Sequence, residues 1–301
     1  MVGFVVRNAV MASCAAAAMA ALAAPAVAAD LTAPAPYVVP AAPVILPANY
    51  NAVSTVNAKF DIAGGYEWGD KFSNHALGKI SGAIAFPIGP EFGVQIDASA
   101  AATRGDWVGA LGGHAFWRNP SIGLLGIYAD GFTTQVPRGS LNVARLGVEG
   151  EYYFDRFRLS GIAGVESGDR TKSRAFVDAL ASWYVQDDLR LYAGYSNTFA
   201  GSQGRAGLEY QLPPSSGWGN FALFGEGRIG EHGYASVLGG VRVYFGESKS
   251  LWRRHREDDP EIWSNENYAA ASQAVSGGTF DKKKKNNKPT CTKADRPCKP
   301  E

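Results

Sequence analysis

The sequence predicts an all-β protein, an antiparallel up-and-down barrel of about twelve strands that spans a membrane. The first observation is that apolar and polar residues alternate in successive stretches between residues 55 and 246, which is the period of a strand with two unlike faces. The second is that aromatic residues gather at the same end of alternate stretches, where a membrane barrel carries its aromatic girdle. The third is an export signal ahead of the stretches.

Residues 1–29 are predicted to be a signal peptide. Arg7 supplies a positive charge, Ala9–Ala24 is an alanine-rich apolar run, and Ala26–Ala29 offers small residues for cleavage. An uncleaved membrane anchor is the alternative, but the run is short for a spanning helix and alanine is weakly hydrophobic. Residues 30–54 contain five prolines, so we expect a stiff, extended and disordered linker.

The last stretch of the barrel shows the alternation most clearly. Val237, Val241 and Val243 lie on one face of a strand there, and Ser236 and Arg242 lie on the other. The fifth stretch is ambiguous because two leucines are adjacent in it. In chain order, the predicted strands are 55–67, 76–86, 92–99, 107–118, 122–131, 144–154, 156–166, 174–183, 189–196, 205–211, 221–228 and 233–246.

The connections between these strands are of two alternating kinds. One set is short, and every strand that runs into it ends in aromatic residues, as at Trp183 and Tyr184. Membrane barrels have short periplasmic turns and longer outer loops, so we expect both chain termini to lie in the periplasm. The other set of connections is polar and slightly longer, and includes 69–74, 133–139, 167–171 and 197–204.

Charged residues recur on the face opposite to the apolar one. Each would cost about 2–4 kcal/mol if it faced lipid at mid-depth, so these side chains are expected to point into the barrel. There they would be hydrated and line a narrow pore, or be paired and dry and fill the barrel. We favour the pore, since small residues such as Gly147 and Gly207 share this face. The predicted pore-lining residues are Lys59, Asp61, Glu67, Lys79, Asp97, His114, Arg118, Arg145, Glu149, Glu151, Arg158, Glu166, Arg174, Asp178, Arg190, Arg205, Glu209, Glu226, Arg228 and Arg242.

Residues 247–301 differ in composition from the strands. Arg253–Arg256 is followed by acidic residues, and Lys282–Lys285 opens a lysine-rich end. We expect a basic, largely disordered periplasmic tail, either simply solvated or attracted to anionic cell-wall polymer or lipid headgroups. Cys291 and Cys298 are close in sequence, so in an oxidising compartment they are candidates for a disulfide.

The sequence contains little that indicates catalysis. Gly225–Gly230 matches a dinucleotide-binding string, but a strand and not a helix follows it. His114 is expected to face the interior, where a hydrogen bond is the better interpretation than catalysis. We expect no catalytic residues, no metal site and no cofactor. The formal net charge of +1 gives no reason to expect a nucleic-acid partner.

Over Thr55–Gly246 the chain resembles the outer-membrane β-barrels of Gram-negative bacteria. The expected mature start Ala29-Asp30-Leu31, with the proline-rich run after it, is similar to small porin-like surface proteins of α-proteobacteria. The aromatic end of the last strand resembles the signal that barrel-assembly machinery reads, although Phe245 is not the last residue here. This resemblance implies outer-membrane location, with outer-membrane lipid and the assembly machinery as partners.

Two functions are compatible with these features. The first is a narrow passive pore for ions or small hydrophilic solutes. The second is a non-conducting structural barrel that the basic tail anchors to the cell wall, with peptidoglycan as its partner. An outer-membrane enzyme is a distant third, because no catalytic group of residues is found. A soluble periplasmic β protein is the alternative at the level of fold class.

Overall fold

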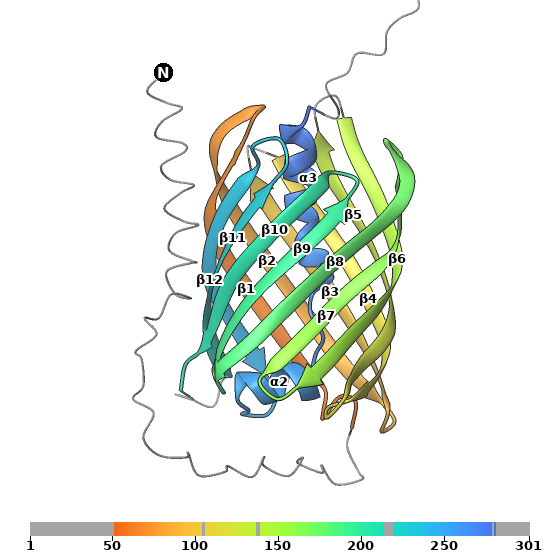
Figure 1. Ribbon diagram of the computed structural model, residues 1–301, viewed down its shortest axis with the longest axis vertical. Coiled ribbons are helices and arrows are strands. Elements are labelled where there is room, and N and C mark those ends of the chain that lie inside the picture. The colour runs from red at the N-terminus through yellow and green to blue at the C-terminus, as the bar shows by residue number, and fades with distance from the viewer. Residues whose placement is uncertain (1–50, 104–105, 137–138, 214–218, 279, 281–301) are drawn as a thin grey trace, which may run out of the picture. The chain divides into compact units, whose positions relative to one another are not determined.

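The computed structural model describes residues 51–103, 106–136, 139–213, 219–278 and 280, which form a closed barrel of twelve antiparallel strands (Figure 1). Each strand pairs with its neighbours in the chain, and β1 pairs with β12 to close the sheet. The predicted fold class is confirmed. The strands are β1 (Asn57–Gly69), β2 (Phe72–Ile88), β3 (Phe92–Thr103), β4 (Asp106–Asn119), β5 (Gly123–Val136), β6 (Gly139–Phe154), β7 (Phe157–Gly168), β8 (Thr171–Gln186), β9 (Leu189–Thr198), β10 (Gly201–Gln211), β11 (Asn220–Gly230) and β12 (Ala235–Phe245).

The two faces of the sheet are unlike, in the phase that the sequence predicts. On β1, Phe60 and Ile62 point outward and are exposed, whereas Asp61 between them is fully buried. Asp61 stands directly opposite Arg242 of β12 in the pairing that closes the barrel. Successive side chains of a strand point to opposite sides of the sheet, so one such pair fixes the phase of both strands.

The two ends of the barrel can be told apart by the chain. β1 begins and β12 finishes at one end, here called the terminal end, which also carries the connections 89–91, 120–122, 155–156, 187–188 and 212–219. The far end carries the connections 70–71, 104–105, 137–138, 169–170, 199–200 and 231–234. The prediction that the connections at the far end are the longer ones is therefore wrong. Their polar residues are mostly strand, because antiparallel pairing continues almost to the tip of each hairpin.

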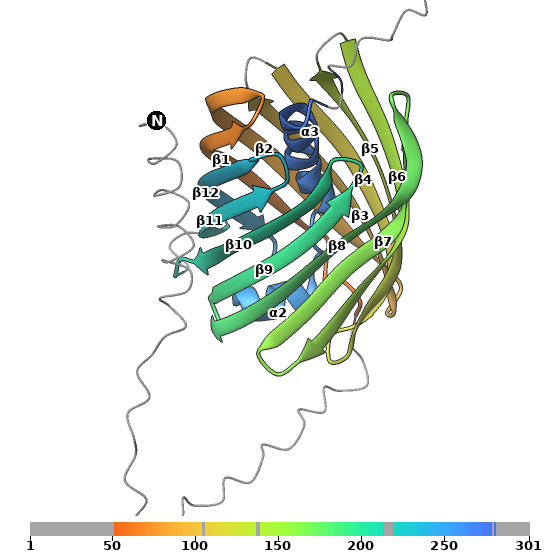
Figure 2. The same ribbon diagram turned by 45° about the horizontal axis from the view of Figure 1, so that its top comes forward.

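The C-terminal segment corrects the sequence prediction most strongly. Residues 247–278 are not a disordered tail: they form α2 (Leu251–Glu257), the 3-10 helix η1 (Trp263–Glu266) and α3 (Asn267–Ser276). α2 lies at the terminal end, and α3 lies inside the barrel toward the far end (Figures 1 and 2). Gly246, with φ of +103°, is where the chain leaves β12, a conformation that glycine adopts without steric cost.

The segment is ordered because it carries side chains that need burial. Trp263, Tyr268 and Ala269–Ala271 are almost completely buried. Tyr268 and the alanines share one apolar cluster with Phe132 and Leu238 of the wall. The segment thus covers apolar side chains of the wall that would otherwise be exposed to water in the lumen.

The start of the described chain also differs from prediction. Ala52 and Val53 belong to the expected disordered linker, yet both are fully buried at the terminal end. Val53 packs with Ala85, Phe116 and Leu124 of the wall. The expected signal peptide, most of the proline-rich linker and the candidate disulfide between Cys291 and Cys298 lie outside the described residues.

Candidate functional site in the barrel lumen

Most of the predicted pore-lining side chains are buried inside the barrel. Three of them are only partly buried there: Arg205, Glu226 and Arg242. Arg174 lies at the rim of the far end, where 42% of its side chain is exposed and its guanidinium donates to Asn197 at 2.9 Å. That these residues line a pore stays a prediction. The buried ones are Lys59, Asp61, Glu67, Lys79, Asp97, His114, Arg118, Arg145, Glu149, Glu151, Arg158, Glu166, Asp178, Arg190, Glu209 and Arg228.

α2 is fixed to the turns of the terminal end. The Trp252 amide donates to the Asp187 carbonyl at 2.8 Å, and the Leu251 amide donates to Asp188 Oδ1 at 3.0 Å. On the other side, the Arg256 guanidinium donates to the carbonyls of Asp155 and of Phe157, the latter at 3.2 Å. The helix therefore bridges the β8–β9 turn and the β6–β7 turn across the mouth of the barrel.

The start of the chain adds a third attachment at this mouth. The Ser54 amide donates to the Glu257 carbonyl at 2.9 Å, and Lys249 donates to Asp258 at 2.8 Å and to Ser54 Oγ at 2.6 Å. These hydrogen bonds and the negative charges nearby raise the pKa of Lys249 above its ordinary value, although its burial opposes the rise. Charged Lys249 thus links the residue stretch before β1 to the segment that follows β12.

His255 of α2 lies between two buried tyrosines. Tyr244 donates its hydroxyl proton to Glu209 Oε1 at 2.6 Å, so its oxygen accepts from His255 Nε2 at 2.9 Å. Tyr184 then donates to His255 Nδ1, also at 2.9 Å. Burial, followed by the positive charge of nearby arginines, lowers the pKa of His255 well below its ordinary value. The imidazole is therefore held neutral, in the tautomer with the proton on Nε2.

Farther in, Glu261 is bonded to two arginines of the wall. Arg158 of β7 and Arg190 of β9 both donate to its Oε1. The arginine side chains are almost completely buried, and 19% of the Glu261 side chain is exposed. Beside it, Lys59 of β1 donates to the Pro260 carbonyl at 2.8 Å and pairs with Asp259.

Five residues later, at the end of η1, Glu266 repeats this arrangement. Its Oε1 pairs with Arg205 of β10, and its Oε2 accepts from Arg228 Nη1 of β11 at 2.5 Å. A buried guanidinium is stable only if it is paired and hydrogen-bonded. Glu261 and Glu266 together bind four wall arginines, each of which also lies within 4 Å of a wall carboxylate: Glu151, Glu209, Asp178 or Glu226. We call Glu261 and Glu266 the bridging glutamates.

Polar residues of the segment bind the opposite wall. Ser264 donates to Asp97 of β3, whose other oxygen is 2.7 Å from His114 Nε2. His114 Nδ1 in turn is 2.8 Å from Glu149 Oε2. Asn267 donates to Asp130 Oδ2 at 2.8 Å. His114 is thus held by two carboxylates, and it makes the buried hydrogen bonds that the sequence suggests.

A small cavity lies between the segment and the wall. The cavity beside the bridging glutamates measures about 50 Å³, with Arg190, Arg242 and Ile262 among its lining residues. That volume accommodates a few water molecules.

The far end of the segment is attached as firmly as its start. Gln273 donates to the Ala200 carbonyl at 2.8 Å, and Ser276 Oγ donates to the His232 carbonyl at 2.6 Å. Ser276 Oγ also accepts from the Asp70 amide at 2.7 Å. Phe280 is buried in the apolar cluster, with the Arg170 guanidinium 5.4 Å from its ring centre. The segment thus crosses the barrel from the terminal end to the far end.

Comparison with known proteins gives similarity of fold only. No family model and no curated protein match the chain. A KdgM porin is similar in structure, with 10% identity, a TM-score of 0.45, and coverage of 62% of this chain and 99% of the porin. Outer membrane phospholipase A from Escherichia coli has 11% identity and a TM-score of 0.45, covering 66% and 93% of the two chains.

An outer-membrane channel from Pseudomonas putida F1 is also similar in structure. It has 10% identity and a TM-score of 0.44, and the match covers 67% of this chain and all of the channel. These structural neighbours are outer-membrane β-barrels, one of which is named as an enzyme. At this level of similarity they indicate no activity or substrate.

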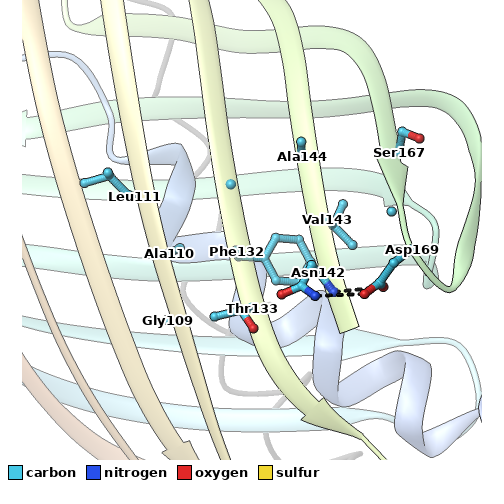
Figure 3. A pocket seen from close by; sticks show the side chains of 12 residues that line it. Gly109, Ala110, Leu111, Phe132, Thr133, Asn142, Val143, Ala144, Ser167 and Asp169 are labelled. Carbon is cyan, nitrogen blue, oxygen red and sulfur yellow. Dashed lines mark hydrogen bonds between the residues drawn. The ribbon is translucent and has the colours of Figure 1, made fainter. Parts of the chain in front are cut away.

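A hollow on the outer surface lies over β4 to β7 and measures about 610 Å³. Its exposed lining includes Leu111, Gly131, Ala144 and Ser167, and the hydrogen bonds from Asn142 to the Asp169 carboxylate border it (Figure 3). Small residues explain the hollow. It holds no cluster of catalytic type.

Within the described ranges, no group of three or more histidine, cysteine, aspartate or glutamate side chains could hold a metal ion. Among the same residues, no helix is long and apolar enough to cross a membrane.

The sequence prediction lacks a charged residue of the wall, Asp130, and all of the segment. Asp130 of β5 is buried and bonded to Arg145 at 2.8 Å, but the adjacent Leu124 and Leu125 obscured the phase of its strand. The segment had a usable signal. Residues 261–278 combine tryptophan, tyrosine and alanine with few charges and end in two glycines, which is typical of a short buried helix with a glycine stop.

Proposed function

We propose that this protein is an outer-membrane β-barrel channel that residues 247–280 of its own chain hold closed. The observation that carries the proposal is the pair of bridging glutamates, each of which binds two arginines from different strands. These four ion pairs join the segment to β7, β9, β10 and β11 inside the barrel. In this state the barrel does not conduct, and it conducts only when the segment is displaced.

The outer surface supports a membrane location. Exposed apolar side chains such as Leu125, Ile127, Leu146 and Val148 form a belt around the barrel. Toward the terminal end, the outward rings of Tyr152, Phe154, Phe157 and Trp183 follow one another with centres 5.3–6.1 Å apart. A row of aromatic rings at one rim is typical of a membrane interface. The export signal that the sequence predicts then favours the outer membrane.

The wall offers no single sign of charge to a passing solute. Arginines, lysines and carboxylates alternate around the lumen in nearly equal number. With the segment displaced, we expect a narrow pore of weak ion preference that passes ions or small hydrophilic solutes. Assembly machinery and outer-membrane lipid are the partners that such a barrel requires.

A permanently closed structural barrel is the second candidate. It is favoured by the number of buried ion pairs between segment and wall, since breaking any one strands a charge in the interior. Cell-wall anchoring would then depend on residues 281–301, because residues 247–278 form helices that pack against the barrel.

Planar-bilayer recording separates these candidates. We expect the purified full chain to be closed most of the time, and the double variant E261Q/E266Q to open at least tenfold more often. Neutral glutamines no longer balance the four arginines, so the segment leaves more readily. The matched control is D187N, which alters an exposed pair at a terminal-end turn.

Two outcomes would decide against the proposal. A full chain that conducts steadily as an open pore would contradict closure by the segment. A double variant that folds, as judged by heat-modifiable gel migration, and remains closed would favour the structural barrel. Binding to purified peptidoglycan would support the anchoring part of that second candidate.

A further inference from the structure

We infer that the barrel carries the C-terminal end of its own chain across the membrane, so that residues 281–301 are displayed on the face opposite to the start of the barrel. This inference rests on the proposed position of residues 247–280 in the lumen. It assigns the lysine-rich end to the outer surface, where the sequence alone places it in the periplasm.

The path of the segment has a fixed beginning. α2 bonds the turns that hold Asp155 and Asp187, and both turns are at the terminal end. β1 also starts at that end, and Ser54, just before it, bonds Glu257 and Asp258. The residues that precede the barrel therefore approach it from this side.

The path also has a fixed end. Ser276 bonds two far-end connections, at Asp70 and at His232. Gly277 lies so close to the His232 ring that an added Cβ would be 2.6 Å from it. Phe280 packs beneath the Arg170 guanidinium of a third far-end connection. Three hairpin tips therefore surround the point where the segment ends.

The remaining chain has no route back. Residues 281–301 carry seven lysines and one arginine against three acidic residues, so a path through lipid is excluded by the cost of burying these charges. A second passage through the lumen would need the space that the segment already fills, and the cavity beside the bridging glutamates measures only about 50 Å³. The basic end must stay on the side where Phe280 lies.

The export signal indicates which side that is. A chain that reaches the outer membrane from the periplasm inserts its hairpin tips outward and leaves both ends of the strand series behind. The terminal end is then periplasmic and the far end faces outward. The barrel thus acts as a conduit for one short cationic extension.

Sidedness of two epitope tags tests this inference. One tag follows Glu301, and the other is inserted in residues 30–50, with antibody binding measured on intact and on permeabilised cells. We expect the C-terminal tag to bind antibody on intact cells at least tenfold above untagged cells, and the N-terminal tag to bind only after permeabilisation. Heat-modifiable migration verifies that each tagged barrel is folded.

Labelling of the untagged chain gives an independent measurement. A membrane-impermeant amine reagent should modify Lys282–Lys285 on intact cells to the same extent as Lys71 and Lys172, which are exposed at the far end. Modification of Lys71 and Lys172 without modification of Lys282–Lys285 would overturn the inference, as would a C-terminal tag that is detected only after permeabilisation.

The two proposals can fail separately. If the C-terminal tag is periplasmic while the full chain is closed in bilayers, the inference that residues 281–301 are displayed outside is wrong. The proposal of a channel that is closed by its own segment would then still hold. If the tag is periplasmic and the full chain conducts steadily, the segment is not in the lumen and both are wrong.

Discussion

The single carboxylate of Glu261 forms ion pairs with two buried arginines of the wall, Arg158 and Arg190. In E261Q, Arg158 and Arg190 stay buried and lose their shorter ion pair, because the carboxylates that remain, Glu151 and Glu209, lie 3.9 Å and 3.6 Å away. Breaking a buried ion pair from one side costs about 3–5 kcal/mol. We expect E261Q to lower the free energy of unfolding by about this amount in urea titrations in detergent or lipid.

The control for this prediction is D187N. Asp187 pairs with Arg156 at the surface, where 57% and 43% of the two side chains are exposed, and such pairs contribute at most about 1 kcal/mol. Equal effects of E261Q and D187N would show that Glu261 is solvated and does not bridge the arginines.

A substitution at Leu146 tests whether the outward face of the barrel contacts lipid. It lies near the middle of β6 and 64% of it is exposed. If this face contacts lipid, L146R should cost about 2–4 kcal/mol of unfolding free energy in a bilayer. S140R, on the same face of the same strand but at its far end, should cost at most about 1 kcal/mol. Equal costs for the two variants would contradict a lipid-facing belt.

At the scale of elements, α2 makes the closed state sensitive to pH. An undocked histidine binds a proton near pH 6.5, whereas the docked His255 has a pKa well below that value. Docking therefore keeps its full free energy above about pH 6.5 and weakens as the pH falls below it. Arg158, Arg190, Lys59 and Arg242 oppose protonation, and Glu209, 3.9 Å away, favours it.

We expect channel openings of the full chain to become several-fold more frequent between pH 7.5 and pH 5.5. In H255Q, where the side chain at 255 does not titrate, this change should be much smaller. Planar-bilayer recording at matched salt checks both proteins. An identical pH response in the two proteins would show that another group controls the docking of α2.

The strands and the C-terminal segment differ in how far the sequence predicts them. A strand repeats every two residues, so stretches such as 144–154 reveal both faces and the phase of the charges. The segment has no such period. Its short helices place apolar side chains against apolar parts of the lumen and polar side chains against charged parts. These parts of the lumen are formed only when the barrel closes. Glu261 and Glu266 therefore have no recognisable pattern until the arginines of four separate strands are brought together.

The far-end connections illustrate a second limit. Polar, glycine-containing stretches such as 69–74 and 167–171 predict loops by composition. In the folded barrel, strands on either side continue to pair, and Phe72 and Thr171 begin the next strands almost at once. Backbone hydrogen bonds between neighbouring strands decide these boundaries, and side-chain composition does not encode them.

At the scale of the whole molecule, the account depends on the segment crossing the lumen. The wall provides the fixed positive and negative groups, and the segment provides the complementary ones from the mouth at α2 to the contacts of Phe280. Both proposals, the closed channel and the displayed C-terminal end, follow from this single passage.

Site-specific photo-cross-linking at residue 263 tests that passage most directly. Trp263 packs with Tyr128 of β5, Ile162 of β7 and Leu180 of β8. A photoreactive phenylalanine derivative at this position, activated in membranes of intact cells, should give intramolecular cross-links to peptides of these three strands. Cross-links confined to lipid or to other proteins would contradict the account, because residue 263 would then lie outside the barrel.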